Sequence, residues 1–264
     1  MSTTTSPLPA DFKEMRPEFF GYSLELADDL LILGHRLSEW CGRGPMLEED
    51  IALSNIALDC LGQAKLLLEL AAEFSEEKTS ADALAFFREA TQFKNSLLVE
   101  QANGDFANTM LRQLFFDSAY SLLLEQLLNS PCKPFADFAA KAQKEIKYHL
   151  RHARNWVDCF GNGTEESRSR LQNAVENLWP FTHELFTSSA SEETLAKKGI
   201  VPARSSLRSA WESSIAEIFS SALLPLPKSE LTPGGGRTGF HTEFLGHLLA
   251  EMQITARSHP GADW

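Results

Sequence analysis

The sequence lacks the cysteine and proline patterns that mark several common classes of small protein. Its four cysteines, at positions 41, 60, 132 and 159, are scattered and form no C-x-x-C pair. This argues against a zinc ribbon and a disulfide scaffold, and it favours a reducing compartment. Residues 46–130 contain no proline, and glycine occurs there only at 62 and 104. A stretch so free of helix breakers favours long helices.

The chain also lacks a basic excess and long apolar runs. It holds 24 Lys and Arg against 36 Asp and Glu, a formal charge of -12. Nucleic-acid binding depends on clustered cations, so this balance argues against that function. The N-terminus has no apolar signal core, and no run approaches the roughly 20 apolar residues that span a bilayer. We therefore expect a cytoplasmic protein with no membrane partner.

What is present is a periodic helical pattern without a hairpin signal or an internal repeat. We predict a flexible N-terminal arm over residues 1–17 and one helical domain over 18–264. Asp105 and Thr164 are predicted N-caps, and Pro180 is expected to bend the helix that Thr164 begins. The first predicted helix ends near residue 41. The others span about 48–74, 80–92, 105–129, 134–160, 164–187, 204–221 and 241–256. The predicted fold class is an all-α four-helix bundle with additional C-terminal helices.

The helices over 48–74 and 105–129 are apolar nearly all round, which is typical of helices enclosed by other helices. Between Ile51 and Ala72 the first carries only Asp59, Lys65 and Glu69 as charges, and the second carries Arg112, Asp117 and Glu125. Carboxylates are almost never fully buried unless they are paired. Asp59 and Asp117 are therefore expected to have partners.

The helix over 134–160 is amphipathic and supplies candidates for those partners. Glu145 and His149 lie four residues apart at the phase of its apolar stripe, so we expect both to face the bundle centre. Five cations leave that stripe and form a basic outer flank, available to an acidic partner or to the phosphates of a coenzyme A ligand: Lys141, Lys144, Lys147, Arg151 and Arg154.

Inward acids in a four-helix bundle raise the hypothesis of a di-iron carboxylate site. Such a site needs a Glu-x-x-His pair on each of two helices, and none of the seven histidines has Asp or Glu three residues before it. Gly62 stands three residues after Asp59, and Tyr148 three after Glu145. Two interpretations stay open for the helix over 134–160: a hydrogen-bonded core cluster, or a mononuclear metal site from Glu145, His149 and His152. Glu39 is a candidate fourth carboxylate, although its phase favours a solvated helix end.

Two further motifs are weaker. Glu243, His247 and Glu251 recur every four residues and are interpreted as a solvated helix face, with a metal site as the alternative. The segment GGGRTG, residues 234–239, resembles a phosphate cradle, but it follows no strand and lacks the Lys-Ser/Thr of a P-loop. We interpret it as a flexible linker.

Four long segments resemble a known family. They are RLSEWCGRGPMLEEDIALSNIALDCLGQAK (36–65), LLVEQANGDFANTMLRQLFFDSAY (97–120), KEIKYHLRHARNWVDCFGNGT (144–164) and GFHTEFLGHLLAEMQ (239–253). They are similar to the C subunits of bacterial ring-1,2-phenylacetyl-CoA epoxidases, which are multicomponent phenylacetyl-CoA oxygenases. The resemblance extends from about residue 20 to Trp264.

This resemblance implies a ferritin-like structural subunit in aerobic phenylacetate catabolism. Such a subunit pairs with a homologous catalytic A subunit that holds the di-iron centre, alongside other oxygenase subunits and a reductase that uses NADPH. The chain itself is then expected to hold no cofactor and no catalytic residue. By helix and phase, the residues that correspond to a vacated metal cavity are Asp59, Asp117, Glu145 and His149. Homodimer formation and contact with phenylacetyl-CoA stay open.

Overall fold

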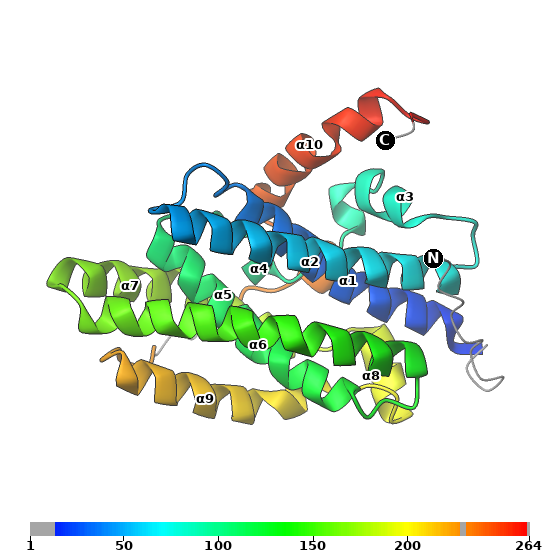
Figure 1. Cartoon of the computed structure of the whole chain (residues 1–264). Coiled ribbons are helices and arrows are strands. Elements are labelled where there is room, and N and C mark those ends of the chain that lie inside the picture. The colour runs from blue at the N-terminus through cyan, green and yellow to red at the C-terminus, as the bar shows by residue number, and fades with distance from the viewer. Residues whose placement is uncertain (1–13, 228–230, 263–264) are drawn as a thin grey trace.

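The computed structural model describes residues 14–227 and 231–262, which are helical with no strand in those ranges (Figure 1). The α-helices are α1 (Arg16–Ser38), α2 (Leu47–Phe74), α3 (Ala81–Phe86), α4 (Leu97–Glu100), α5 (Phe106–Leu127), α6 (Lys133–Asn162), α7 (Glu165–Leu178), α8 (Ala190–Lys197), α9 (Arg208–Ser221) and α10 (Glu243–Ser258). Short 3-10 segments are η2 (Ala90–Gln92), η3 (Trp179–Phe186), η4 (Arg204–Leu207) and η5 (Gly236–Thr238).

Four long helices form the bundle. The hairpin of α1 and α2 packs beside the hairpin of α5 and α6, with α2 running next to α6 (Figure 1). Helices α7 and α9 cover α5 and α6, and α8 packs on α1. This is the predicted all-α ferritin-like bundle with additional C-terminal helices.

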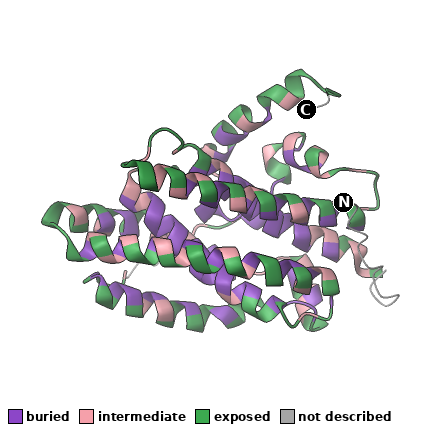
Figure 2. Ribbon diagram, in the orientation of Figure 1, coloured by how far each residue is buried: buried purple, intermediate pink, exposed green. Residues whose placement is uncertain are grey.

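Burial differs sharply between the two helices whose sequences are apolar on every side (Figure 2). Helix α5 has 17 of its 22 residues buried, as predicted, whereas α2 has only 11 of 28. The outer side of α2 exposes Leu47 at 72%, Ile51 at 52% and Leu58 at 66%. The prediction that other helices enclose α2 is therefore wrong for this chain alone, because composition cannot tell a packed face from an uncovered one.

Aromatic clusters fill the core. Phe19, Phe74 and Phe135 stack and tilt against one another where α1, α2 and α6 meet, with ring centroids 5.0 to 6.4 Å apart. A second cluster joins Phe115 of α5 to Trp211 of α9, whose indole Nε1 donates to Ser118 Oγ at 2.7 Å. Because aromatic side chains bury large areas, the first cluster holds α1, α2 and α6 together and the second holds α5 against α9.

The helix ends follow the predicted capping chemistry in part. Asp105 accepts from the Asn108 backbone at 2.9 Å, and Thr164 from the Ser167 backbone at 3.1 Å, which confirms both N-caps. Beyond Leu178 the chain continues through Pro180 as the 3-10 segment η3, and α8 was not predicted. The predicted arm lies outside the described residues up to 13, and α1 already begins at Arg16.

The GGGRTG segment is not a flexible linker, so that interpretation is wrong. Its Arg237 is buried and donates to Asp29 Oδ2 at 2.6 Å and to the backbone oxygen of Lys94 at 2.8 Å. Gly236 lies so close to the core that an added Cβ would stand 2.2 Å from the Asn95 carbonyl oxygen. Glycine is required here because the backbone of this segment lies against the backbone of Asn95. A run of glycines of this kind looks the same in the sequence as a flexible linker.

We predict that Gly236→Ala destabilises the fold by about 1 to 3 kcal/mol, because the new methyl group must push the Asn95 backbone away. Gly246→Ala is the matched control. An added Cβ at Gly246, on the exposed side of α10, meets nothing within 4 Å, so this change should stabilise by about 0.5 to 1 kcal/mol. Urea unfolding measures both. Equal free energies of unfolding for the two variants would contradict the close contact.

Candidate functional site

Three polar pairs join α2 to α6, and we call them the α2–α6 ladder. Residues on α2 meet residues on α6 in reverse order, as expected for antiparallel helices. The pairs are Glu49 Oε2 with His152 Nε2 at 2.7 Å, Asp59 Oδ2 with His149 Nε2 at 3.0 Å, and Gln63 Nε2 donating to Glu145 Oε2 at 2.7 Å. On α6 the three members stand three and four residues apart, which places them on one side of that helix. On α2, Asp59 and Gln63 stand four residues apart, whereas Glu49 stands ten residues before Asp59.

Three of the predicted site acids lie near enough to the buried thiol of Cys60 to affect its ionisation. Burial raises the pKa of the Cys60 thiol well above its usual range, and the carboxyl groups of Asp117, Asp59 and Glu145 raise it further. The Tyr120 hydroxyl donates to Gln63 Oε1 at 3.3 Å and so connects α5 to the ladder. Cys60 was not a sequence candidate; its place directly after Asp59, in the apolar stretch that became α2, is the signal that could have found it.

Asp117 is the most deeply buried acid of this group. It is fully buried, and burial raises its pKa well above the ordinary 3.8 although the Gln113 amide works against the shift. Gln113 Nε2 donates to Asp117 Oδ1 at 2.9 Å and to Oδ2 at 2.8 Å. The partner expected for Asp117 is thus Gln113, one turn earlier on the same helix. Burial favours the protonated, uncharged carboxyl group.

His149 is fully buried beside the partly exposed Asp59. Burial lowers the pKa of His149, and the neighbouring Asp59 carboxylate opposes this effect. A neutral imidazole that donates its Nε2 hydrogen to Asp59 fits this environment. Within the described part of the chain, Nδ1 of His149 and Nδ1 of His152 have no hydrogen-bond partner.

The ladder does not assemble a metal-ligand set. Glu145, His149 and His152 each contact a different residue of α2, so the three side chains do not converge on one point. Among the described residues, no group of three or more His, Cys, Asp or Glu side chains is placed to hold a metal ion. The amides of Gln63 and Gln113 donate hydrogen bonds to Glu145 and Asp117, the carboxylates that a di-iron centre would need as ligands. These residues therefore do not fit that cofactor.

Glu39, the candidate fourth carboxylate, belongs to another cluster. Its Oε1 pairs with Arg36 Nη1 at 2.7 Å, and its Oε2 accepts from Asn103 Nδ2 at 2.9 Å. Neither contact involves the ladder. Glu39 therefore ties the end of α1 to the segment before α5.

A second buried network centres on α1, and sequence reasoning missed it. Three acid and arginine pairs tie α1 or α8 to distant segments: Asp28 with Arg88, Asp29 with Arg237 at 2.6 Å, and Glu192 with Arg204 at 2.9 Å. The sequence held a signal for this network, because Glu25, Asp28 and Asp29 stand among the leucines of α1. Acids within an apolar helix need partners, as was argued for Asp59 and Asp117.

Glu25 is the acid in excess within this network. Burial raises its pKa to about 7, although Arg237 and Arg204 lie near enough to oppose the shift. Three carboxyl groups, those of Glu25, Asp29 and Glu192, share two guanidinium groups, so one proton neutralises the cluster. The network holds α1, α8 and the GGGRTG segment together.

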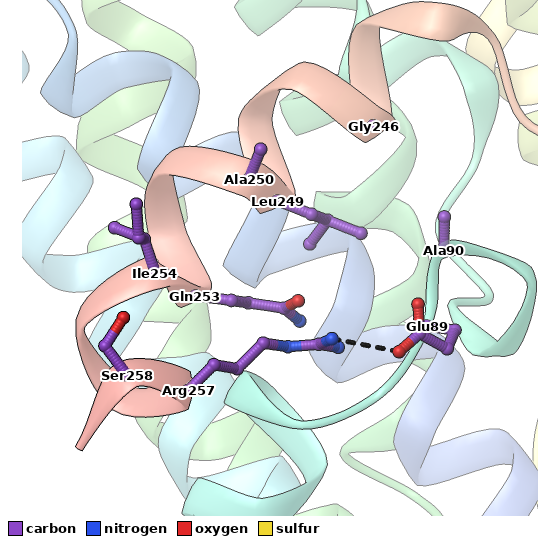
Figure 3. A pocket seen from close by; sticks show the side chains of 9 residues that line it. All are labelled: Glu89, Ala90, Gly246, Leu249, Ala250, Gln253, Ile254, Arg257 and Ser258. Carbon is purple, nitrogen blue, oxygen red and sulfur yellow. Dashed lines mark hydrogen bonds and ion pairs between the residues drawn. The ribbon is translucent and has the colours of Figure 1, made fainter. Parts of the chain in front are cut away.

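A surface hollow of about 460 Å³ lies between α10 and η2 (Figure 3). Its polar side chains are already engaged: Arg257 Nη1 pairs with Glu89 Oε1 at 2.9 Å, and Gln253 Nε2 donates to the Arg88 carbonyl at 3.0 Å. Small residues such as Gly246 and Ala250 form much of the remaining lining. The hollow therefore directs no free charged group toward a ligand. On the outer side of α10, Glu243, His247 and Glu251 are exposed, which agrees with a solvated face.

Comparison with known proteins places this chain in a family. Residues 4–264 match the family described as phenylacetic acid catabolic protein. The chain is 45% identical to the C subunit of the 1,2-phenylacetyl-CoA epoxidase of Escherichia coli (strain K12), over 243 residues that cover 92% of this chain and 98% of that relative. The chain belongs to the phenylacetic acid catabolic protein family.

This membership confirms the resemblance found in the sequence and gives the chain a role in phenylacetate catabolism. Because the match to the family spans nearly the whole length, it covers both the ladder and the α1 network. The polar centre is thus a feature of a phenylacetic acid catabolic protein.

One described helix of this family member, α2, is long and apolar enough to cross a membrane by length and composition alone. Asp59 and Lys65 interrupt the apolar residues of this helix, so it contains no uninterrupted apolar run of the length considered in the sequence. Less than half of its most apolar stretch is buried in the fold. Packing against α1 accounts for the buried share, as it does for core helices of other bundles.

We predict that Asp117→Ala destabilises the protein by about 1 to 3 kcal/mol, because it leaves the buried Gln113 amide without an acceptor. Asp117→Asn is the control, since its amide oxygen can still accept and it carries no ionisable proton. Thermal unfolding at neutral pH measures both variants. A melting temperature for Asp117→Ala equal to that of the wild type would show that the contact contributes nothing.

The raised pKa of Glu25 predicts a pH dependence. The folded state holds the proton up to about pH 7, whereas an unfolded glutamate releases it near 4.5, so the stability that this group contributes is greatest below pH 4.5 and falls as pH rises toward 7. The loss should reach about 1.4 kcal/mol per pH unit within that window. Relative to Glu25→Gln, the wild type should therefore lose stability between pH 5 and pH 8. Parallel pH profiles for the two proteins would refute the shift.

Proposed function

We propose that this chain is a non-catalytic structural subunit of a multicomponent phenylacetyl-CoA monooxygenase, a ring epoxidase of aerobic phenylacetate catabolism. It would pair with a homologous di-iron catalytic A subunit and with the other subunits of the oxygenase. The name of the Escherichia coli relative, which designates a subunit of an epoxidase, supports this proposal.

One observation carries the proposal: each acid at the bundle centre is paired with an amide or an imidazole and is not left free as a metal ligand. Glu145 accepts from Gln63, Asp117 accepts from Gln113, and Asp59 contacts His149. Amide and imidazole partners hold the carboxyl groups at helix contacts, where a metal centre would need several of them directed at one point.

The role of the residues in the α2–α6 ladder is then to stabilise the fold. The α2–α6 ladder supplies hydrogen bonds across the seam between the two hairpins, where burial would otherwise leave polar groups unsatisfied. The epoxidation of the phenylacetyl ring would take place in the partner subunit. The task of this chain would be to present a rigid bundle surface to that partner.

A turnover assay tests this division of labour. We expect no phenylacetyl-CoA oxidation by this chain with a reductase alone, and full turnover when the A subunit is added. The double variant Glu145→Gln, His149→Gln should assemble with the A subunit and keep the turnover number of the wild-type complex, because both glutamines can retain a hydrogen bond to α2.

Size-exclusion chromatography of the assembled pair and a melting curve of the variant control for folding. Turnover by the isolated chain, or loss of turnover in a fully assembled variant complex, would contradict the proposal. Either result would favour an autonomous metalloenzyme that uses Glu145, His149 and His152.

A further inference from the structure

The outer side of α6 carries a row of five exposed cations, which we call the α6 basic stripe: Lys141, Lys144, Lys147, Arg151 and Arg154. The helix crosses the front of the molecule with this exposed side outward (Figure 2). From its first member to its last, the stripe extends about 20 Å along the helix axis. It stands out in a chain whose formal charge is -12.

The stripe is unfavourable for the isolated fold. Its members follow one another at spacings of three or four residues, where like charges on a helix repel. Among the described residues, Arg154 alone of the five has an ion-pair partner, Glu217 of α9 at 3.6 Å. Arg151 lies 5.7 Å from the ring centre of Tyr148. A chain with 36 acids could supply carboxylates here, yet most of the row is left uncompensated.

We propose that the α6 basic stripe binds an acidic face of another protein subunit of the oxygenase. This inference rests on the proposed function, since it assigns the surface by which a structural subunit meets a partner. A complementary row of carboxylates would remove the repulsion between the five cations and would orient the two proteins during encounter.

The shape of the stripe favours a protein over a small phosphate ligand. Phosphate recognition needs donors that converge on one point, whereas these side chains are distributed along a convex helix. The net charge of -12 disfavours long polyanions such as nucleic acid, because they feel the repulsion of the whole chain. A local contact between proteins is governed by charges within a screening length of about 8 Å.

Exposed apolar side chains beside the stripe add the other component of a protein interface. Tyr148 is 43% exposed and Leu58 of α2 is 66% exposed. Each stands one residue before a member of the Asp59 and His149 pair, so both are exposed on the turns of α2 and α6 that contact each other. Aromatic residues beside cations are typical of interface patches.

Charge reversal tests the inference in the assembled complex. The chain is co-expressed with all oxygenase subunits and purified through a tag on the A subunit, and its affinity for each subunit is measured as salt is raised. Lys144→Glu with Lys147→Glu should weaken binding to one subunit by about tenfold or more at low salt, and the difference should shrink as salt rises.

The matched control is Lys197→Glu with Lys198→Glu, which makes the same charge change at two exposed residues at the end of α8. This control should bind as the wild type does. Folding is checked separately. The stripe variant should melt at or above the wild-type temperature, because each new carboxylate stands three or four residues from a remaining cation, Lys141 or Arg151.

Affinities and salt dependence of the stripe variant equal to those of the control would overturn the inference and leave the proposed function intact. Failure of the wild-type chain to bind any oxygenase subunit would contradict the proposed function itself, and the inference with it. The two failures are therefore distinguishable.

Discussion

The constraint on which this structure depends is that carboxyl groups inside a helical bundle must be satisfied or neutralised. An isolated buried charge is far more costly than a buried polar pair, so every inward acid needs a donor, a counter-charge or a proton. The chain uses all three. Gln63 donates to Glu145, Arg237 neutralises Asp29, and burial keeps the proton on Asp117.

These solutions divide the molecule into two polar regions with different chemistry. The α2–α6 ladder is made of amides, imidazoles and acids, and its three pairs include no arginine or lysine. The α1 network relies on arginines, since Arg88 and Arg237 pair with acids of α1 and Arg204 pairs with Glu192 of α8. The first region holds the two hairpins together across their seam, and the second fastens the later segments of the chain onto α1. Among the described residues, neither arrangement directs three or more ligand side chains at one point, which supports the proposal that the chemistry takes place in a partner.

Much of this fold follows from the sequence because periodicity and capping are local. The spacing of apolar residues defined α5 and α6, and Asp105 and Thr164 marked where helices begin. The pairing of Asp59 with His149 was less accessible, because it depends on which helices become neighbours. The same limit explains the exposed side of α2. It also explains Arg237, whose buried partner Asp29 lies 208 residues earlier in the chain.

We propose that the polar centre of this chain is structural and that iron, when bound in the complex, resides in the partner. The most direct measurement is anomalous X-ray scattering at the iron edge from crystals of the chain in complex with the A subunit after exposure to Fe(II). We expect iron peaks in the A subunit and none between α2, α5 and α6 of this chain. A peak within contact of Asp59, Glu145 and His149 would contradict it.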